Sequence, residues 1–135
     1  MMVIPTLHFC GQCEEAISLY KKAFGCKVHS LMYYADAVQR GWEQDNPEKR
    51  NYIYHSEVYF GNQLFRMSDG AETDCNTNTS VFFAITLDTV VNVEVAFAVL
   101  QTNGTVIDKL ESTPYSACMG SVMDNYGIRW RVMTE

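Results

Sequence analysis

Two cysteines near the start of the chain stand at a spacing that can carry redox or metal chemistry. Cys10 and Cys13 form a C-x-x-C motif in the stretch LHFCGQCEEAISLYKKAFG. Such a pair between a strand and a helix is typical of thiol oxidoreductases, or it supplies half of a zinc site. The chain holds no second C-x-x-C and no H-x₃-H, and the carboxylates of Glu14 and Glu15 disfavour a thiolate at Cys13. A tight loop that holds two small residues is the simpler interpretation.

Arginines near the C-terminus are a second candidate for chemistry. In the strand-like run IRWRV, Arg129 and Arg131 are two residues apart and share a face, while Ile128, Trp130 and Val132 point the other way, toward a helix. Guanidinium groups bind carboxylates and phosphates through paired hydrogen bonds. The pattern therefore predicts a site for a small anion. The alternative is that the arginines are solvated or paired with acidic residues across the sheet: Glu57, Asp69 or Asp124.

Composition narrows the classes of partner. The chain has 135 residues, enough for one domain with a core, and a formal net charge of −6. An acidic chain without a basic stripe binds nucleic acid poorly, and no segment is long and apolar enough to span a membrane. The chain shows no signal peptide, so we expect a cytoplasmic protein. An odd count of five cysteines then favours reduced thiols over a disulfide framework.

In the first half of the chain, the sequence predicts a strand, a helix, a second strand and then a hairpin. Residues 3–9 have the pattern of a strand, and residues 13–24 have the apolar face of a helix. Acidic residues occupy the first turn of this predicted helix and lysines its last turns, and Gly25 is a typical C-terminal stop. Residues 27–34 read as a strand. The polar stretch 35–51 reads as a loop that is long enough to form a lid. The runs YIYHSEVYF and QLFRMS, joined at Gly61-Asn62, predict a hairpin.

The second half repeats this order. Residues 80–87 read as a strand, and Asp88 is a candidate N-cap for a helix that runs to Thr102. Several valines there favour a strand, but strict alternation fails and the first half sets a helical precedent. Residues 106–110, 120–123 and 128–133 read as further strands. The sequence predicts a single α+β domain of two β-α-β-β-β modules with curved mixed sheets, at 1–70 and 80–135, joined by a linker at 71–79.

The chain resembles the vicinal oxygen chelate superfamily, the glyoxalase and bleomycin-resistance fold, and within it the PhnB-like subfamily. The resemblance is carried by short motifs in a shared order: Leu7-His8-Phe9, Gly11, CEEAISLYKKAFG, His55 with FGNQLFRMSD, Gly120-Ser121-Val122-Met123-Asp124 and YGIRW. It implies a ligand pocket within each curved sheet and a homodimer. Many relatives hold a divalent metal through His or Gln and two carboxylates, and this metal acts as a Lewis acid.

The metal ligands do not carry over to this chain. The first ligand position falls on Pro5, the two carboxylate positions fall near Arg66 and on Arg131, and the fourth falls near Ser80 or Val81. Arginine stays protonated and has no lone pair for a cation. We therefore expect no metal at the superfamily site and no cofactor. A relocated metal site using His8, His55 and Glu57 is a remaining alternative.

The predicted ligand site joins arginines and aromatic side chains. Its members are Arg66, Arg129, Arg131, Phe9, Tyr54 and Tyr115. We expect metal-independent binding of a small anionic or planar molecule. The alternatives are a metal-dependent lyase, isomerase or dioxygenase with a relocated site, and a thiol redox protein that uses Cys10 and Cys13. No Gly-rich nucleotide loop, nucleophile elbow or zinc-helix motif is present. The sequence leaves open the natural ligand and whether any reaction is catalysed.

Overall fold

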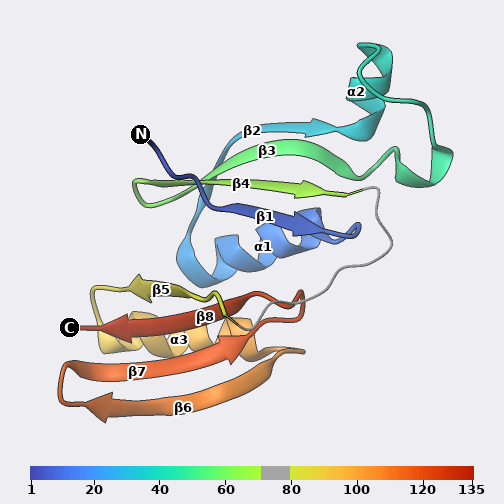
Figure 1. Ribbon diagram of the computed structural model, residues 1–135. Helices are drawn as coiled ribbons and strands as arrows, with labels where there is room; N and C mark the ends of the chain where they lie inside the picture. The colour runs from blue at the N-terminus through green and yellow to red at the C-terminus, as the bar shows by residue number, and fades with distance from the viewer. Residues whose placement is uncertain (71–79) are drawn as a thin grey trace. The chain divides into compact units, whose positions relative to one another are not determined.

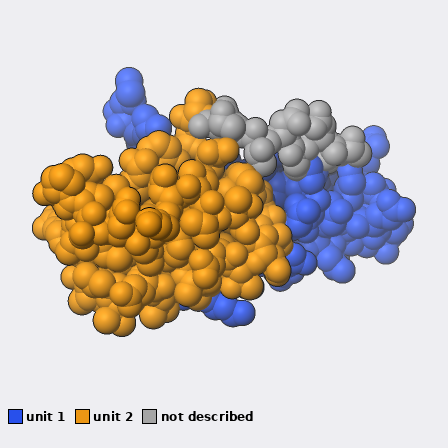
Figure 2. Space-filling model, turned by 90° about the horizontal axis from the view of Figure 1, so that it is seen from below, with its two compact units in different colours: residues 1–75 blue, residues 76–135 orange. Residues whose placement is uncertain are grey.

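The computed structural model describes residues 1–70 and 80–135, so the linker expected at 71–79 lies outside the described residues. The chain divides into two compact units, Met1–Cys75 and Asn76–Glu135, which are coloured separately in Figure 2. No helix in the described ranges has the length and apolar character that a membrane crossing needs.

Unit 1 contains a four-stranded mixed sheet with one long helix across a face (Figure 1). The strand order is β1-β4-β3-β2; β1 runs parallel to β4, and the other neighbours are antiparallel. The predicted hairpin at Gly61-Asn62 is confirmed as β3 and β4. The elements of the unit are β1 (Thr6–Phe9), α1 (Cys13–Phe24), β2 (Lys27–Tyr33), α2 (Tyr34–Gln39), the 3₁₀ turn η1 (Pro47–Lys49), β3 (Ile53–Phe60) and β4 (Gln63–Asp69).

Helix α1 has the predicted bounds because its sequence is consistent at every level. Its buried side chains recur at helical spacing: Cys13, Ala16, Ile17, Tyr20 and Ala23. Acidic residues occupy its first turn and lysines its last, which suits the helix dipole. Gly25 ends the helix with a φ of 65°, a left-handed conformation that glycine adopts without a steric penalty.

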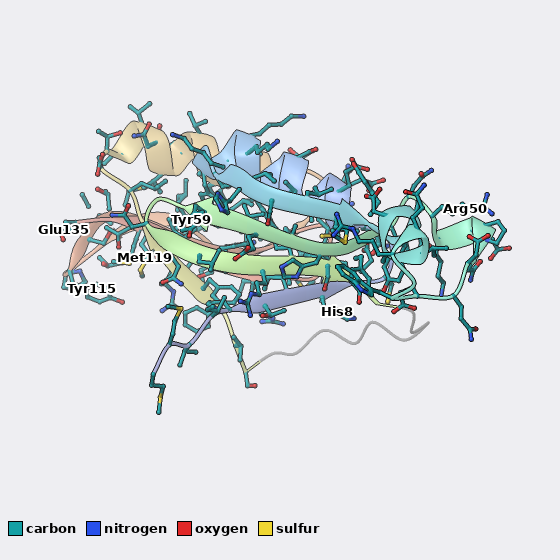
Figure 3. The ribbon with its side chains drawn as sticks, turned by 90° about the horizontal axis from the view of Figure 1, so that it is seen from above. His8, Arg50, Tyr59, Tyr115, Met119 and Glu135 are labelled. Carbon is teal, nitrogen blue, oxygen red and sulfur yellow. The ribbon has the colours of Figure 1, made fainter. Side chains whose placement is uncertain are left out.

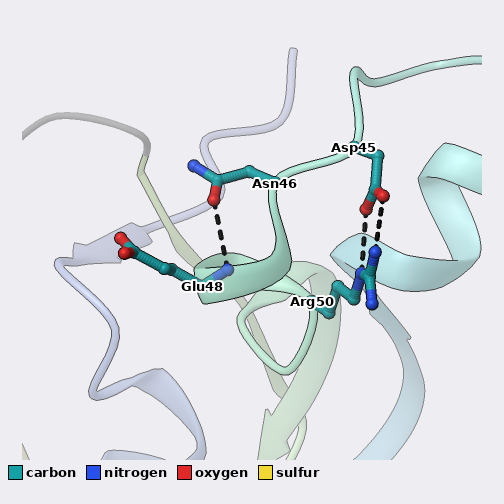
Figure 4. A network of polar contacts seen from close by, with 4 residues as sticks. All are labelled: Asp45, Asn46, Glu48 and Arg50. Carbon is teal, nitrogen blue, oxygen red and sulfur yellow. Dashed lines mark hydrogen bonds and ion pairs between the residues drawn. The ribbon is translucent and has the colours of Figure 1, made fainter.

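The prediction of a loop over 35–51 is wrong in part, because most of α2, which begins at Tyr34, and all of η1 fall in this segment (α2 is labelled in Figure 1). Local hydrogen bonds stabilise both pieces. The Asp36 side chain accepts a hydrogen bond from the Tyr33 N–H at 3.0 Å, and the Asn46 side chain accepts one from the Glu48 N–H at 3.1 Å. Asp45 and Arg50 form an exposed ion pair through two contacts, at 2.6 and 2.9 Å (Figure 4).

Unit 2 repeats the topology of unit 1. Its strand order is β5-β8-β7-β6, with β5 parallel to β8 and the remaining neighbours antiparallel. The predicted α+β class, with two β-α-β-β-β modules and mixed sheets, is confirmed. The elements are β5 (Phe83–Thr86), α3 (Val90–Gln101), β6 (Thr105–Thr113), β7 (Ser116–Met123) and β8 (Arg129–Thr134).

The valine-rich segment is helical, as predicted, but it starts from a different cap. Thr89, not Asp88, is the N-cap of α3, and its hydroxyl accepts a hydrogen bond from the Asn92 N–H at 3.1 Å. The buried side chains of the helix itself are Val93, Ala96, Phe97 and Leu100. Helical spacing of bulky apolar residues therefore outweighs the strand propensity of the valines.

A buried carboxylate joins three separate segments of unit 1. Asp69, at the end of β4, is 2% exposed. Its Oδ1 accepts hydrogen bonds from the N–H groups of Gly11 at 2.8 Å and Cys13 at 3.0 Å, and its Oδ2 accepts one from Ile53 at 2.9 Å. The negative charge also lies at the N-terminus of α1, where the helix dipole is favourable. Asp69 therefore fixes the loop before α1 against the start of β3.

A second buried carboxylate closes the β7–β8 hairpin of unit 2. The Asp124 side chain is 2% exposed. Its Oδ1 accepts hydrogen bonds from the N–H groups of Tyr126 at 2.9 Å and Ile128 at 3.0 Å, and its Oδ2 accepts one from the Trp130 indole at 2.9 Å. Asp124 therefore sets both the turn and the position of the largest core side chain on β8.

We predict that Asp69→Asn destabilises the chain by about 3 kcal/mol, since a buried charged acceptor is replaced by an amide that turns a donor toward a backbone N–H. The measurement is the free energy of unfolding in urea. Asp45→Asn is the matched control, because the same chemical change there affects an exposed ion pair. Equal unfolding midpoints for the two variants would contradict the role given to Asp69.

Candidate functional site

The open face of the sheet in unit 2 carries the arginines that the sequence singled out. Along β8, Trp130, Val132 and Thr134 are buried, while Arg129 and Arg131 are only half-buried. Side chains of a strand alternate between its two faces. Because α3 packs against β7 and β8, the buried set faces this helix and the two arginines share the opposite face, as the alternation predicted.

Arg129 and Arg131 line the same cavity, which has a volume of about 210 Å³. Its other polar lining residues are Asp108 on β6 and Ser121 on β7. Its apolar lining comes from Phe82, Ile107 and Trp130. Pockets for drug-sized ligands usually measure about 300–1,000 Å³. A cavity of this size suits a compact molecule with a few polar groups.

Both guanidinium groups keep hydrogen-bonding capacity. The Arg131 Cζ atom lies 4.5 Å from the centre of the Phe82 ring, and its Nε donates to the Ser121 hydroxyl at 3.4 Å. The Arg129 Nε is buried and has no hydrogen-bond partner in residues 1–70 and 80–135. Neither arginine forms an ion pair within those ranges. Buried polar atoms are usually hydrogen-bonded, so the Arg129 Nε marks a place where an acceptor is missing.

Strand register places a row of polar side chains across the sheet of unit 2. Arg131 on β8 is paired with Ser121 on β7, and Ser121 is paired with Asp108 on β6. Neighbouring strands lie about 4.8 Å apart, so the Cα atoms of Asp108 and Arg131 are separated by about 10 Å. The cavity therefore has a cationic side and an anionic side, with a hydroxyl between them.

Ser121, Asp108 and Phe82 were not predicted as site residues. The turn centred on Tyr126 pairs Met123 with Arg129 and Ser121 with Arg131, and this pairing can be counted from the sequence once the hairpin is assigned. Asp108 has no such signal, because the β6–β7 register shifts on both sides of it.

Arg66 occupies a similar place on the sheet of unit 1. It lies on β4, is exposed, and is paired in register with Thr6 on β1 and Glu57 on β3. Glu57 also accepts a hydrogen bond from the Ser30 hydroxyl at 3.3 Å. A carboxylate thus stands directly across from Arg66, whereas Ser121 stands across from Arg131.

The aromatic residues of the predicted site lie in three different environments. Phe9 is 2% exposed and belongs to the core of unit 1. Tyr54 is half-buried and packs edge-to-face on Tyr34, with ring centres 5.3 Å apart. Tyr115 lies in the turn between β6 and β7 and is 66% exposed, at the same end of the unit as Glu135 (Figure 3). The cavity lining comes from unit 2 and includes none of these side chains.

Comparison with known families supports the resemblance seen in the sequence. Residues 1–133 match the family described as 3-demethylubiquinone-9 3-methyltransferase. The chain belongs to this family. The family resemblance predicted from the sequence is confirmed by this match. A search of curated proteins finds no match.

Solved structures similar to this family member share its fold. The protein PA1353 from Pseudomonas aeruginosa has a TM-score of 0.83 at 23% identity, covering 100% of this chain and 98% of its own. The PhnB protein from Bacillus cereus has a TM-score of 0.81 at 22% identity and covers 100% of both chains. The fosfomycin resistance protein FosX from Listeria monocytogenes has a TM-score of 0.66 at 6% identity, covering 100% and 93%. These likenesses confirm the glyoxalase and bleomycin-resistance fold.

In this family member the two cysteines of the C-x-x-C motif are not a pair of reduced thiols, and they are not bonded to each other. Cys13 is a free thiol with no exposed surface, and Cys10 is disulfide-bonded, so Cys13 is not its partner. The expectation of reduced thiols is therefore wrong for Cys10. Burial raises the pKa of the Cys13 thiol far above its ordinary value, and the charges of Asp69 and Glu14 raise it further. A redox cysteine needs the opposite shift and access to solvent, so the structure weighs against a thiol redox site.

The histidine-based metal alternative gains no support from the geometry. The Nδ1 atom of His8 lies 3.1 Å from the Ser68 hydroxyl (His8 is labelled in Figure 3). Within the described parts of the chain, no three or more His, Cys, Asp or Glu side chains gather in a way that could hold a metal ion. The guanidinium groups of Arg66 and Arg131, at the positions where the resemblance implies carboxylates, do not fit a cation.

We predict that Cys13 of the native protein stays unmodified by iodoacetamide at pH 8, because its side chain is inaccessible and its pKa is raised. Mass spectrometry of the digested protein measures the extent of alkylation. The control is the same reaction in urea, where the exposed thiol reacts. Rapid alkylation of native Cys13 would show that the motif is accessible and would restore the redox interpretation.

Proposed function

We propose that this chain is a metal-independent binding protein for a small anionic molecule, which it holds in the cavity of unit 2. The observation that carries the proposal is the cavity itself, where Arg129 and Arg131 stand together without an ion pair among the described residues. An anion with two acceptor oxygens would accept hydrogen bonds from both guanidinium groups. The buried Nε of Arg129 would gain the acceptor that it lacks.

An anion is favoured over a planar apolar ligand. The ring of Phe82 is already covered on one face by Arg131. The tyrosines expected to form a planar surface lie elsewhere, Tyr54 against Tyr34 and Tyr115 in an exposed turn. A carboxylate, phosphonate or phosphate group is the chemistry that two arginines recognise best. Binding by a homodimer stays a prediction, as does a cytoplasmic location.

The family description names a methyl transfer, and we do not extend that activity to this chain. The sequence has no G-x-G-x-x-G loop, which is a common way to hold a nucleotide-containing methyl donor. A fold also hosts many chemistries, so family membership by itself does not select a reaction.

We predict that propylphosphonate raises the melting temperature of the protein, since a ligand that binds only the folded state stabilises it. Arg131→Met and Arg129→Met should each weaken binding at least about tenfold, whereas Arg131→Lys, which keeps the charge but loses the fork, should have an intermediate effect. Differential scanning fluorimetry over a range of ligand concentrations measures these changes.

The matched control for Arg131→Met is Arg40→Met, because Arg40 also stacks on an aromatic ring, that of Trp42, and lies outside the cavity lining. Arg66→Met should leave binding unchanged, since Arg66 lies on the sheet of unit 1, outside the cavity lining. Unchanged stabilisation in both the Arg129 and the Arg131 variant would refute the proposed site.

We predict that the protein retains no stoichiometric metal after incubation with manganese, nickel, iron(II) or zinc under reducing conditions, followed by gel filtration. The physical reason is that arginine side chains at the implied ligand positions repel a cation. Elemental mass spectrometry provides the measurement. About one metal per chain would contradict the argument from the arginines and would favour a metal-dependent enzyme with a relocated site.

A further inference from the structure

We propose that the cavity of unit 2 selects ligands that carry an ammonium or another donor group in addition to their anion, and that Asp108 is the residue that determines this specificity. The inference rests on the proposed anion binding by Arg129 and Arg131. It adds a second requirement on the ligand, which makes a small zwitterion the preferred class.

The position of Asp108 supports this inference. Asp108 lines the cavity together with the arginines, but it lies on β6, two strands away from Arg131 on β8. Ser121 stands between them on β7. A separation of about 10 Å between the Cα atoms leaves the carboxylate and the guanidinium on opposite sides of one cavity. A compact ligand with charges at both ends can contact both sides.

The charges of the cavity are not neutralised among themselves. Asp108 forms no ion pair with Arg129, Arg131 or any other residue of the described ranges. Asp108 is exposed, so its carboxylate remains available to a ligand. A simple anion would satisfy the arginines and leave its own charge facing Asp108, which is unfavourable. A zwitterion would satisfy both sides, because its ammonium group would face the carboxylate.

The remaining lining suits the part of the ligand between its charged groups. Phe82 and Ile107 supply apolar surface within the same cavity. A short aliphatic spacer would rest on this surface, while the Ser121 hydroxyl would donate to or accept from a polar group near the middle. The volume of about 210 Å³ favours a short, unbranched spacer.

The test compares two probes that differ by one amino group, 3-aminopropylphosphonate and propylphosphonate. Isothermal titration calorimetry gives their dissociation constants for the wild-type protein and for Asp108→Asn. We expect the wild-type protein to bind the amino probe about three- to fivefold more tightly, in the range found for exposed charge pairs. In Asp108→Asn the two constants should converge, because the amino probe loses its partner and propylphosphonate loses a repulsion.

Glu111→Gln is the matched control, because it removes the same charge from the same strand at a residue outside the cavity lining. It should preserve the preference of the wild-type protein for the amino probe. Equal affinities of the wild-type protein for both probes, or an unchanged ratio in Asp108→Asn, would overturn the role of Asp108 while anion binding stands. Failure of both probes to bind would overturn the proposed function together with this inference.

Discussion

The alternation of side chains along β8 is the constraint on which the site depends. Trp130 and Val132 are fully buried, and the Trp130 indole donates to the buried Asp124. This hydrogen bond and the apolar packing fix the register of the strand. A shift by one residue would expose the tryptophan and turn both arginines toward α3, at a large cost in desolvation. The core of unit 2 therefore forces Arg129 and Arg131 to share the open face, and the cavity follows from this packing.

The two units show how one topology can hold an arginine in different electrostatic settings. In unit 1, the residue paired with Arg66 across the strands is Glu57, so a counter-charge stands on the adjacent strand. In unit 2, the residue paired with Arg131 is Ser121, and the acidic residue of the row, Asp108, stands one strand farther away. Compared with unit 1, a neutral hydroxyl lies beside the guanidinium in unit 2, and the opposite charges are farther apart. The row in unit 2 therefore separates its opposite charges by one strand more than the row in unit 1 does.

Much of the fold could be predicted from the sequence because its longer elements are locally consistent. Helix α1 combines an apolar stripe, charges that suit its dipole and a terminal glycine. Helix α3 was predicted despite its valines, since bulky residues recur at helical spacing. Helix α2 was missed because it is six residues long and buries only Ala37. Its stability comes from short-range hydrogen bonds such as that from Tyr33 to Asp36, which leave no periodic pattern.

The part of the site that could be predicted is the part that depends only on the alternation of side chains along one strand. Arg129 and Arg131 required only the alternation of β8. Ser121 required the pairing of β7 with β8, and a count outward from the turn at Tyr126 supplies it. Asp108 required the pairing of β6 with β7, where irregular register defeats any count along the chain. The aromatic candidates were chosen by type alone, and burial or turn geometry then placed them outside the cavity lining.

The identity of the residues at the implied ligand positions decides which charge the site can accept. A pair of carboxylates on this fold attracts a divalent cation, and the cation then gathers the oxygens of a substrate. Arginine at such a position presents the positive charge directly, so an anion can bind without a bridging metal. The protein then loses a strong Lewis acid and gains directional donors in its place. Such an exchange favours recognition over bond polarisation, and this is the physical reason for proposing that the cavity of unit 2 binds an anion.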